Sequence, residues 1–195
     1  MAKRETDRNS RRQQRREDAA KQRRRQMLLL LIPVVLVVGF VTFLLIRQFS
    51  PIEGVVSYGN QDRTHDTEAL YPFTPLPPVG GAHQPIWQNC GIYDQPIEVA
   101  LALHSMEHGA VWIAYQPELP NDQLRELRDL AGAQPLVLLT PYPGLARPVI
   151  VSAWGVQLQL DNADDARLEQ FVNRYRGQGP EIGATCAGGV GSPIG

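Results

Sequence analysis

The sequence predicts a small α+β domain that follows a single apolar helix near the N-terminus. Two observations support this prediction. Residues 27–46 form an uninterrupted apolar run, and residues 110–175 alternate strand-like and helix-like patterns in the order β-α-β-β-α. Elements in that order pack as helices against one sheet. We therefore expect one transmembrane helix and a globular domain over 71–195 that begins with a Pro-rich strap.

The predicted anchor is the run MLLLLIPVVLVVGFVTFLLI at 27–46, which contains no ionisable side chain. A helix needs about 20 apolar residues to cross a hydrocarbon core about 30 Å thick. A secretory signal peptide has a shorter apolar core, of about 7 to 15 residues, and ends at a cleavage site between small residues. Residues 47–51 (RQFSP) offer no such site. We therefore predict an uncleaved, single-pass anchor in the cell membrane, with the lipid bilayer as its partner.

Charge is divided unevenly between the two sides of this anchor. Residues 1–26 carry 11 Lys and Arg against four acids, a charge of +7, whereas residues 48–195 carry seven Arg against 16 acids, a charge of −9. Basic flanks of a membrane helix stay in the cytoplasm. The pattern therefore predicts a cytoplasmic tail at 1–26 and an extracytoplasmic C-terminal domain. The negative charge of that domain argues against a nucleic-acid partner.

Two segments connect the anchor to the regular part of the domain. Residues 47–70 are polar and aperiodic, so we expect a spacer in which His65 is solvated. Residues 71–85 contain five Pro, which favours an extended path outside a sheet. This segment could be a rigid stalk or a strap laid over the domain. Its aromatic residues favour the strap, because a stalk would expose them.

Apolar periodicity defines the remaining elements. It predicts four strands, at 110–115, 136–140, 149–153 and 156–160. A first helix is expected to be capped by Asn121 and to end at Gly132. A second helix, with apolar residues at i, i+3, i+4 and i+7, is expected to be capped by Asp161 or Asn162 and to end at Gly177.

Cys90 and Cys186 are the only cysteines, and both follow the anchor. In an oxidising compartment such a pair most often forms one disulfide. A crosslink closing a loop of about 100 residues contributes up to about 4.7 kcal/mol in the chain-entropy description. The alternative is that Cys90 is a soft metal ligand near the histidines.

Three of the four histidines, His83, His104 and His108, lie within 26 positions. On a helix, the i and i+4 positions of His104 and His108 would present two imidazoles on one face, an arrangement that can bind one metal ion. On an extended strand, Met106 would join them on that face. Imidazole with thioether suits copper, whereas imidazole with carboxylate or water suits zinc. The sequence alone does not choose between the two backbones.

The segment His104-Ser105-Met106-Glu107-His108 also matches the H-x-x-E-H pattern of inverted zinc proteases, in which Glu107 would be the general base. Such a site needs a continuing helix and a third ligand from another helix. Gly109 and the strand that follows it end any helix here, which argues against a protease. The same residues could instead form a buried polar network in which Glu107 orients an imidazole.

Three short motifs together resemble one protein family. They are Gly81-Ala82-His83, Trp87-x-x-Cys90-Gly91-x-Tyr93 and His104-Ser105-Met106-Glu107-His108-Gly109-Ala110-Val111. On these motifs the chain resembles the domain-of-unknown-function family number 3105 over about residues 54–190. That family is typically anchored by one N-terminal helix and has no established activity. The resemblance implies that five residues share one site: His83, Cys90, His104, Glu107 and His108. The family more usually has Leu at the position of Met106, which argues against a thioether ligand.

These observations lead to one hypothesis and two alternatives. We predict an extracytoplasmic domain that binds a transition metal, zinc or copper, through His104 and His108, with His83 as the third ligand. The first alternative is a non-enzymatic structural or interaction domain with a buried His/Glu network. The second is a metal-dependent hydrolase that uses Glu107 as its base, and the sequence leans against an enzyme.

Overall fold

The structure is a computed structural model that describes residues 2–194. It divides into two compact units, Met1–Pro51 and Ile52–Gly195. Met1 and Gly195, the outer ends of the predicted segments 1–26 and 71–195, lie outside the described residues. The two units are described separately below.

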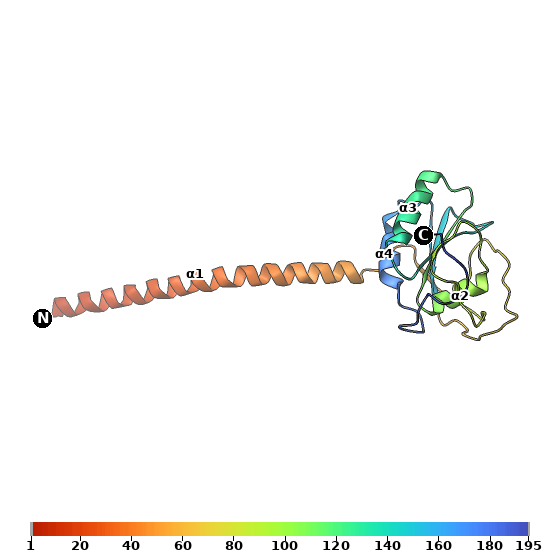
Figure 1. The fold of residues 1–195 in the computed structure, drawn as a ribbon. Coiled ribbons are helices and arrows are strands. Elements are labelled where there is room, and N and C mark those ends of the chain that lie inside the picture. The colour runs from red at the N-terminus through yellow and green to blue at the C-terminus, as the bar shows by residue number, and fades with distance from the viewer. Residues whose placement is uncertain (1, 195) are drawn as a thin grey trace. The chain divides into compact units, whose positions relative to one another are not determined.

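The first unit is one continuous helix, α1 (Ala2–Phe49), with Pro33 in its interior (Figure 1). Within it, Lys21–Leu44 is long and apolar enough to cross a membrane. The large apolar side chains described between Met27 and Leu44 are exposed. The prediction of one N-terminal apolar helix is confirmed. A signal sequence near the N-terminus passes the same test, so this helix establishes the capacity to span a bilayer and not the topology.

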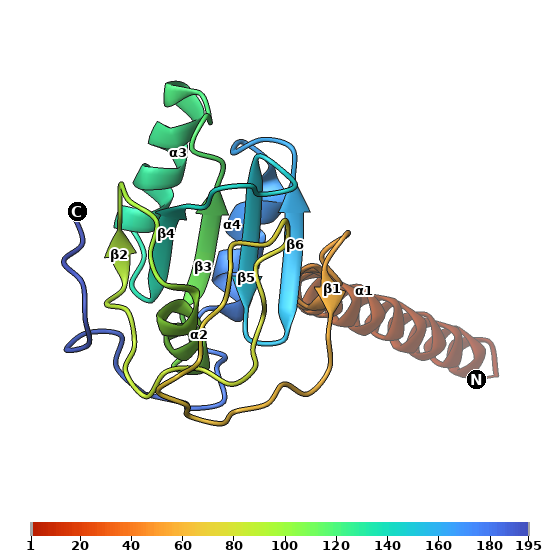
Figure 2. The same cartoon turned by 90° about the vertical axis from the view of Figure 1, so that its right-hand side faces the viewer.

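The second unit is built on a six-stranded mixed sheet in the order β1-β6-β5-β3-β4-β2 (Figure 2). Its strands are β1 Val56–Ser57, β2 Gly91–Ile92, β3 Val111–Tyr115, β4 Val137–Pro141, β5 Val149–Ala153 and β6 Val156–Leu160. β4 runs parallel to both β3 and β2, whereas β5 is antiparallel to β3 and β6. The α+β class is therefore confirmed. Over Val111–Tyr175 the elements follow the order β-α-β-β-β-α, with one strand more than the predicted β-α-β-β-α.

Helices cover both faces of this sheet. α3 (Asn121–Gly132) and α4 (Ala166–Tyr175) lie on one face, and α2 (Val99–Glu107) lies on the other (Figure 2). On the first face, Ile113 shares a buried cluster with Leu127 of α3 and Phe171 of α4. On the opposite face, Trp112 is buried with Leu103 of α2. Consecutive strand residues point to opposite faces, so β3 contributes to both clusters.

The Pro-rich segment is a strap on the domain, as predicted, and not a stalk. Phe73 packs edge-on against Tyr142 with ring centroids 4.8 Å apart. The Pro75 carbonyl accepts a hydrogen bond from the Ala146 amide at 2.8 Å, and the Pro77 carbonyl accepts one from Gln157 Nε2 at 2.9 Å. Proline has no amide hydrogen to donate, so in both hydrogen bonds the proline carbonyl is the acceptor.

Part of the segment expected as a polar spacer also belongs to the compact unit. Ile52 is buried in the core, and β1 pairs with β6. Further along, His65 forms an isolated parallel bridge with His83 of the strap. The sequence predicted only a polar spacer here, because these pairings depend on residues far away in the chain.

Both predicted helix caps are wrong. α3 is preceded by Pro120, and the structure gives no side-chain cap hydrogen bond there, so Asn121 is the first helical residue instead. At α4 the cap is Asp165, whose carboxylate accepts a hydrogen bond from the Arg167 amide at 2.9 Å. Asp161 and Asn162 lie in the turn that leaves β6, several residues before the helix begins.

Candidate metal centre

The histidines of the sequence motif gather at the C-terminal end of α2. The residues from His104 to Glu107 are helical, and His108 is the C-cap of the helix. The helical arrangement considered above is therefore correct. As a result, Nε2 of His104 lies 3.0 Å from Nε2 of His108. Helical spacing places the two rings one turn apart on the same side.

The extended alternative, with Met106 as a thioether ligand, is wrong. Met106 is fully buried in the apolar cluster that includes Leu103 and Trp112. Because α2 is a helix, the side chain two positions from His104 points into the core rather than toward the imidazoles. The donors at this site are therefore nitrogen and oxygen atoms.

The ring orientations are fixed by the backbone. In three histidines Nδ1 faces a carbonyl oxygen: His83 at 2.8 Å from Gly81, His104 at 2.6 Å from Gln84 and His108 at 2.6 Å from Thr185. A carbonyl oxygen can only accept, so each Nδ1 carries the proton that it donates. In the neutral ring, the lone pair is then on Nε2. This is the arrangement that orients imidazole ligands toward a metal ion.

Burial supports a neutral ring at His104. His83, His104 and His108 are 0%, 3% and 6% exposed. Burial lowers the pKa of His104, and the neighbouring imidazoles lower it further, although the hydrogen bond to the Gln84 carbonyl partly opposes them. His104 is therefore a neutral nitrogen donor at neutral pH.

Glu107 is the charged centre of the cluster. Its side chain is 1% exposed, and its Oε1 accepts a hydrogen bond from Arg63 Nε at 2.6 Å. Its Oε2 lies 3.0 Å from Nε2 of His83 and 3.3 Å from Nε2 of His65. Burial by itself raises the pKa of Glu107, but the hydrogen bond from Arg63 and the positive potential of His83 outweigh it, and the net pKa is lowered. The carboxylate is therefore ionised and fully engaged.

The structure gathers these donors in two groups that could each hold a metal ion. The first contains His65, His83, His104 and Glu107, and the second contains His104, His108 and Glu181. Within each group all ligand atoms lie within 4.8 Å of one another. The three histidines predicted as ligands are thus divided, with His83 in the first group, His108 in the second and His104 in both.

The C-terminal segment completes the second group. Cys90 and Cys186 lie at disulfide distance, with Cα atoms 5.4 Å apart, as expected. Cys90 therefore faces Cys186 and is not a ligand beside the histidines. The Cys90 amide also donates to the Cys186 carbonyl at 2.9 Å. This connection holds Thr185 against His108, while Oε2 of Glu181 lies 3.3 Å from His108 Nε2.

Close backbone packing brings the same segment across the end of α2. The Gly177 amide donates to the Gly109 carbonyl at 2.8 Å, and the Glu181 amide donates to the Glu107 carbonyl at 3.1 Å. A methyl group on Gly179 would overlap both the Glu107 carbonyl oxygen and the Gly109 amide. Gly179 is therefore required for this approach, because only glycine leaves room for the crossing backbone.

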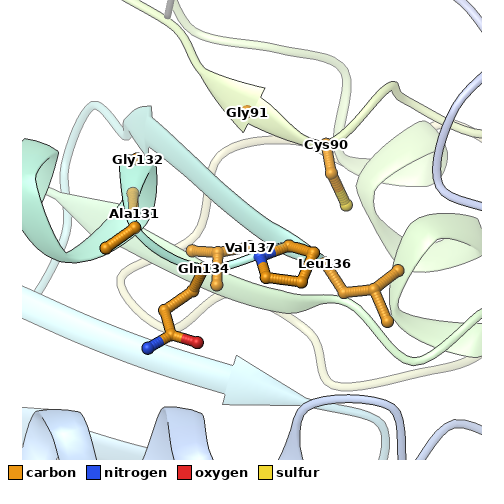
Figure 3. Close-up of a pocket in the computed structure, with 9 residues that line it drawn as sticks. Cys90, Gly91, Ala131, Gly132, Gln134, Leu136 and Val137 are labelled. Carbon is orange, nitrogen blue, oxygen red and sulfur yellow. The ribbon is translucent and has the colours of Figure 1, made fainter.

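A separate cavity of about 290 Å³ lies between the Cys90–Gly91 segment and the turn that follows α3 (Figure 3). It is lined largely by apolar side chains and backbone, and no histidine contributes to it. The sulfur atom in its lining is Sγ of Cys90, which is paired with Cys186. This cavity is distinct from the imidazole cluster.

Sequence reasoning missed three residues of the cluster: Arg63, His65 and Glu181. His65 was expected to be solvated. Its side chain is indeed 42% exposed, yet it stacks on His104 with ring centroids 4.8 Å apart. Glu181 follows the last helix in a Gly-rich stretch with no local pattern. Only the histidine content of the spacer could have drawn attention to His65.

A comparison with known protein families finds one match over most of the compact domain. The family described as "Protein of unknown function (DUF3105)" matches residues 64–188, which is more than half of the chain. The chain belongs to the DUF3105 family. The matched range includes all four histidines, Glu107, Glu181 and both cysteines of this DUF3105 domain, and it begins directly after Arg63. No curated protein and no solved structure matches the chain.

Proposed function

We propose that the DUF3105 domain binds one transition-metal ion, zinc or copper, through His104 and His108. One observation carries this proposal. Both Nδ1 atoms donate to carbonyl oxygens, so both Nε2 lone pairs face each other at 3.0 Å. Two lone pairs at that distance repel each other unless a cation lies between them. A metal ion coordinated by both Nε2 atoms would remove this repulsion.

The distances suit a metal ion of the size of zinc. Zinc–nitrogen bonds of about 2.0–2.1 Å in a tetrahedral site place neighbouring ligand atoms about 3.3 Å apart. The separations are 3.0 Å between His104 and His108 and 3.3 Å between His108 and Glu181. Imidazole nitrogen and carboxylate oxygen suit zinc and Cu(II), whereas Cu(I) prefers sulfur. Neither Met106 nor Cys90 is available to supply sulfur.

The proposal includes a location outside the cytoplasm. The basic segment 1–26 favours retention of the N-terminus in the cytoplasm, and α1 has the length and composition to span the bilayer. An oxidising compartment would allow the crosslink between Cys90 and Cys186. The lipid bilayer would then be the only partner that the proposal requires.

The alternative is a structural network, which the contacts of Glu107 favour. Arg63, His83 and His65 all contact its carboxylate, and this would satisfy the buried charge without a metal. The same contacts argue against the hydrolase alternative. A general base must be free to accept a proton from water, whereas both oxygens of Glu107 are already engaged.

Metal analysis of the full-length protein separates these alternatives. Protein purified in detergent, with the disulfide oxidised, is dialysed against Zn²⁺, Cu²⁺ and Co²⁺ in turn, and bound metal is measured by mass spectrometry. We expect one ion per chain for the wild type and none for the double variant His104→Gln, His108→Gln. The control is Asp161→Asn, an exposed acid paired with Arg147 away from the cluster, which should keep its metal. A folded wild type that binds no ion would leave the structural network as the function.

A further inference from the structure

We infer that the cluster offers one ion two alternative positions that share His104, so that the ion can exchange between them without leaving the protein. This inference rests on the proposed function, and it extends it from one binding position to two. The outer position has His108 and Glu181 as its other ligands. The inner position has His83, His65 and Glu107.

The sharing of His104 makes the two positions mutually exclusive. Its Nδ1 is held by the Gln84 carbonyl at 2.6 Å, so only Nε2 can coordinate. That nitrogen has one lone pair and can bind one ion at a time. Both donor groups include His104, and within each group the ligand atoms lie within 4.8 Å of one another. The cluster therefore binds one ion with two ligand sets.

Each position is built for coordination independently of the other. In the outer position, Nδ1 of His108 is fixed by the Thr185 carbonyl at 2.6 Å. In the inner position, Nδ1 of His83 is fixed by the Gly81 carbonyl at 2.8 Å, and Nε2 faces Oε2 of Glu107 at 3.0 Å. Nε2 of His83 thus faces a second potential ligand atom, as Nε2 of His104 does in the outer position.

Each position also has one ligand that reaches solvent. The side chain of Glu181 is 39% exposed, and that of His65 is 42% exposed, whereas the shared His104 is buried. Arg63 connects the two sides, since its Nε lies 2.6 Å from Glu107 and its Nη2 lies 3.8 Å from Glu181. An ion could therefore enter at one side and leave at the other. Such an arrangement suits the transfer of an ion more than its permanent storage.

The test compares variants that remove one ligand from each position, using Co²⁺ as the probe. Co²⁺ titrations of the full-length protein in detergent are followed by visible absorption, which reports the ligand set. We expect one Co²⁺ per chain in the wild type. His108→Gln and His83→Gln should each still bind one Co²⁺, about tenfold or more weaker, with different spectra. His104→Gln should bind none.

A measurement on the wild type alone keeps the inference testable if one of the variants fails to fold. Cu²⁺ paramagnetic resonance should show two nitrogen-ligated species whose sum equals one ion per chain. Two ions per chain, or a single species, would overturn the inference. The inference would also be overturned if His108→Gln lost Co²⁺ binding while folded His83→Gln kept the wild-type affinity. That result would assign the ion to the outer position alone. A wild type that binds no ion would instead refute the proposed function itself.

Discussion

Removal of the Cys90–Cys186 crosslink is the perturbation with the best-defined expected size. The two cysteines are 96 positions apart. A crosslink that closes a loop of about 100 residues contributes about 4.7 kcal/mol in the chain-entropy description, whereas measured values are usually about 2–4 kcal/mol. For a unit of about 150 residues, each kcal/mol changes Tm by roughly 2–4 °C. We therefore expect the double variant Cys90→Ala, Cys186→Ala to lower the Tm of the 52–195 unit by about 10 °C.

The same variant should weaken metal binding. Cys186 directly follows Thr185, whose carbonyl oxygen holds Nδ1 of His108 at 2.6 Å. Without the crosslink this segment is held mainly by backbone hydrogen bonds, and it can leave the end of α2 more easily. Loss of the hydrogen-bond partner of an imidazole ligand typically lowers metal affinity about 10- to 100-fold. We expect a loss of zinc affinity within that range.

The assay uses the full-length protein in detergent. Unfolding is followed by tryptophan fluorescence, because all three Trp lie in the 52–195 unit and the α1 helix contributes no signal. Zinc affinity is measured by competition with a chelating dye. A reductant should reproduce the variant's behaviour in the wild type and leave the variant unchanged. An unaltered Tm would refute the stabilisation argument, and an unaltered zinc affinity at lowered Tm would show that the segment does not depend on the crosslink.

Three further predictions concern the fold and the site. Gly179→Ala should lower stability by about 1–3 kcal/mol, as overpacking usually does, and should weaken Zn²⁺ binding in the dye-competition assay, whereas Gly132→Ala, where the added methyl meets only ordinary contacts, should do neither. Phe171→Ala removes a fully buried ring and should lower the free energy of unfolding in urea by about 3–5 kcal/mol. Asp165→Ala removes the cap of α4 and should lower it by about 1 kcal/mol at pH 7. The hydrogen bond from Arg167 lowers the pKa of Asp165 in the folded state, so its contribution is complete above the unfolded pKa of about 3.9 and is lost as the pH falls through the lower folded value. Urea unfolding should therefore show a smaller difference between wild type and Asp165→Ala at pH 3 than at pH 7.

The central part of the fold was predictable because its signals are local. Strands β3 to β6 and helices α3 and α4 follow from apolar periodicity within short windows. β1 and β2 contain two residues each, and they are strands only because distant residues pair with them. α2 was ambiguous for a different reason. Nearly all of its residues are buried, so it lacks the polar face by which an amphipathic helix is identified.

The part of the site that has a local sequence signal was also predictable. His104 and His108 lie one helical turn apart, so their spacing alone suggested a shared ligand face. Glu181 lies 73 positions after His108, and its place beside that imidazole depends on the route of the C-terminal segment. The carbonyl groups that fix each Nδ1 belong to the backbone, which carries no residue-specific signal. The tautomers that support metal binding could therefore come only from the structure.

The crosslink connects the proposed location of the domain to its proposed chemistry. Where thiols remain reduced, Cys90 and Cys186 stay separate, and the C-terminal segment is not held covalently across the end of α2. The outer ligand Glu181 and the Thr185 carbonyl that orients His108 both lie on that segment. The inner ligands His65 and His83 lie instead on the strand-like path before Cys90, and they do not depend on the C-terminal segment. We therefore infer that the outer position assembles fully only after the domain has reached an oxidising compartment, while the inner position can form before that.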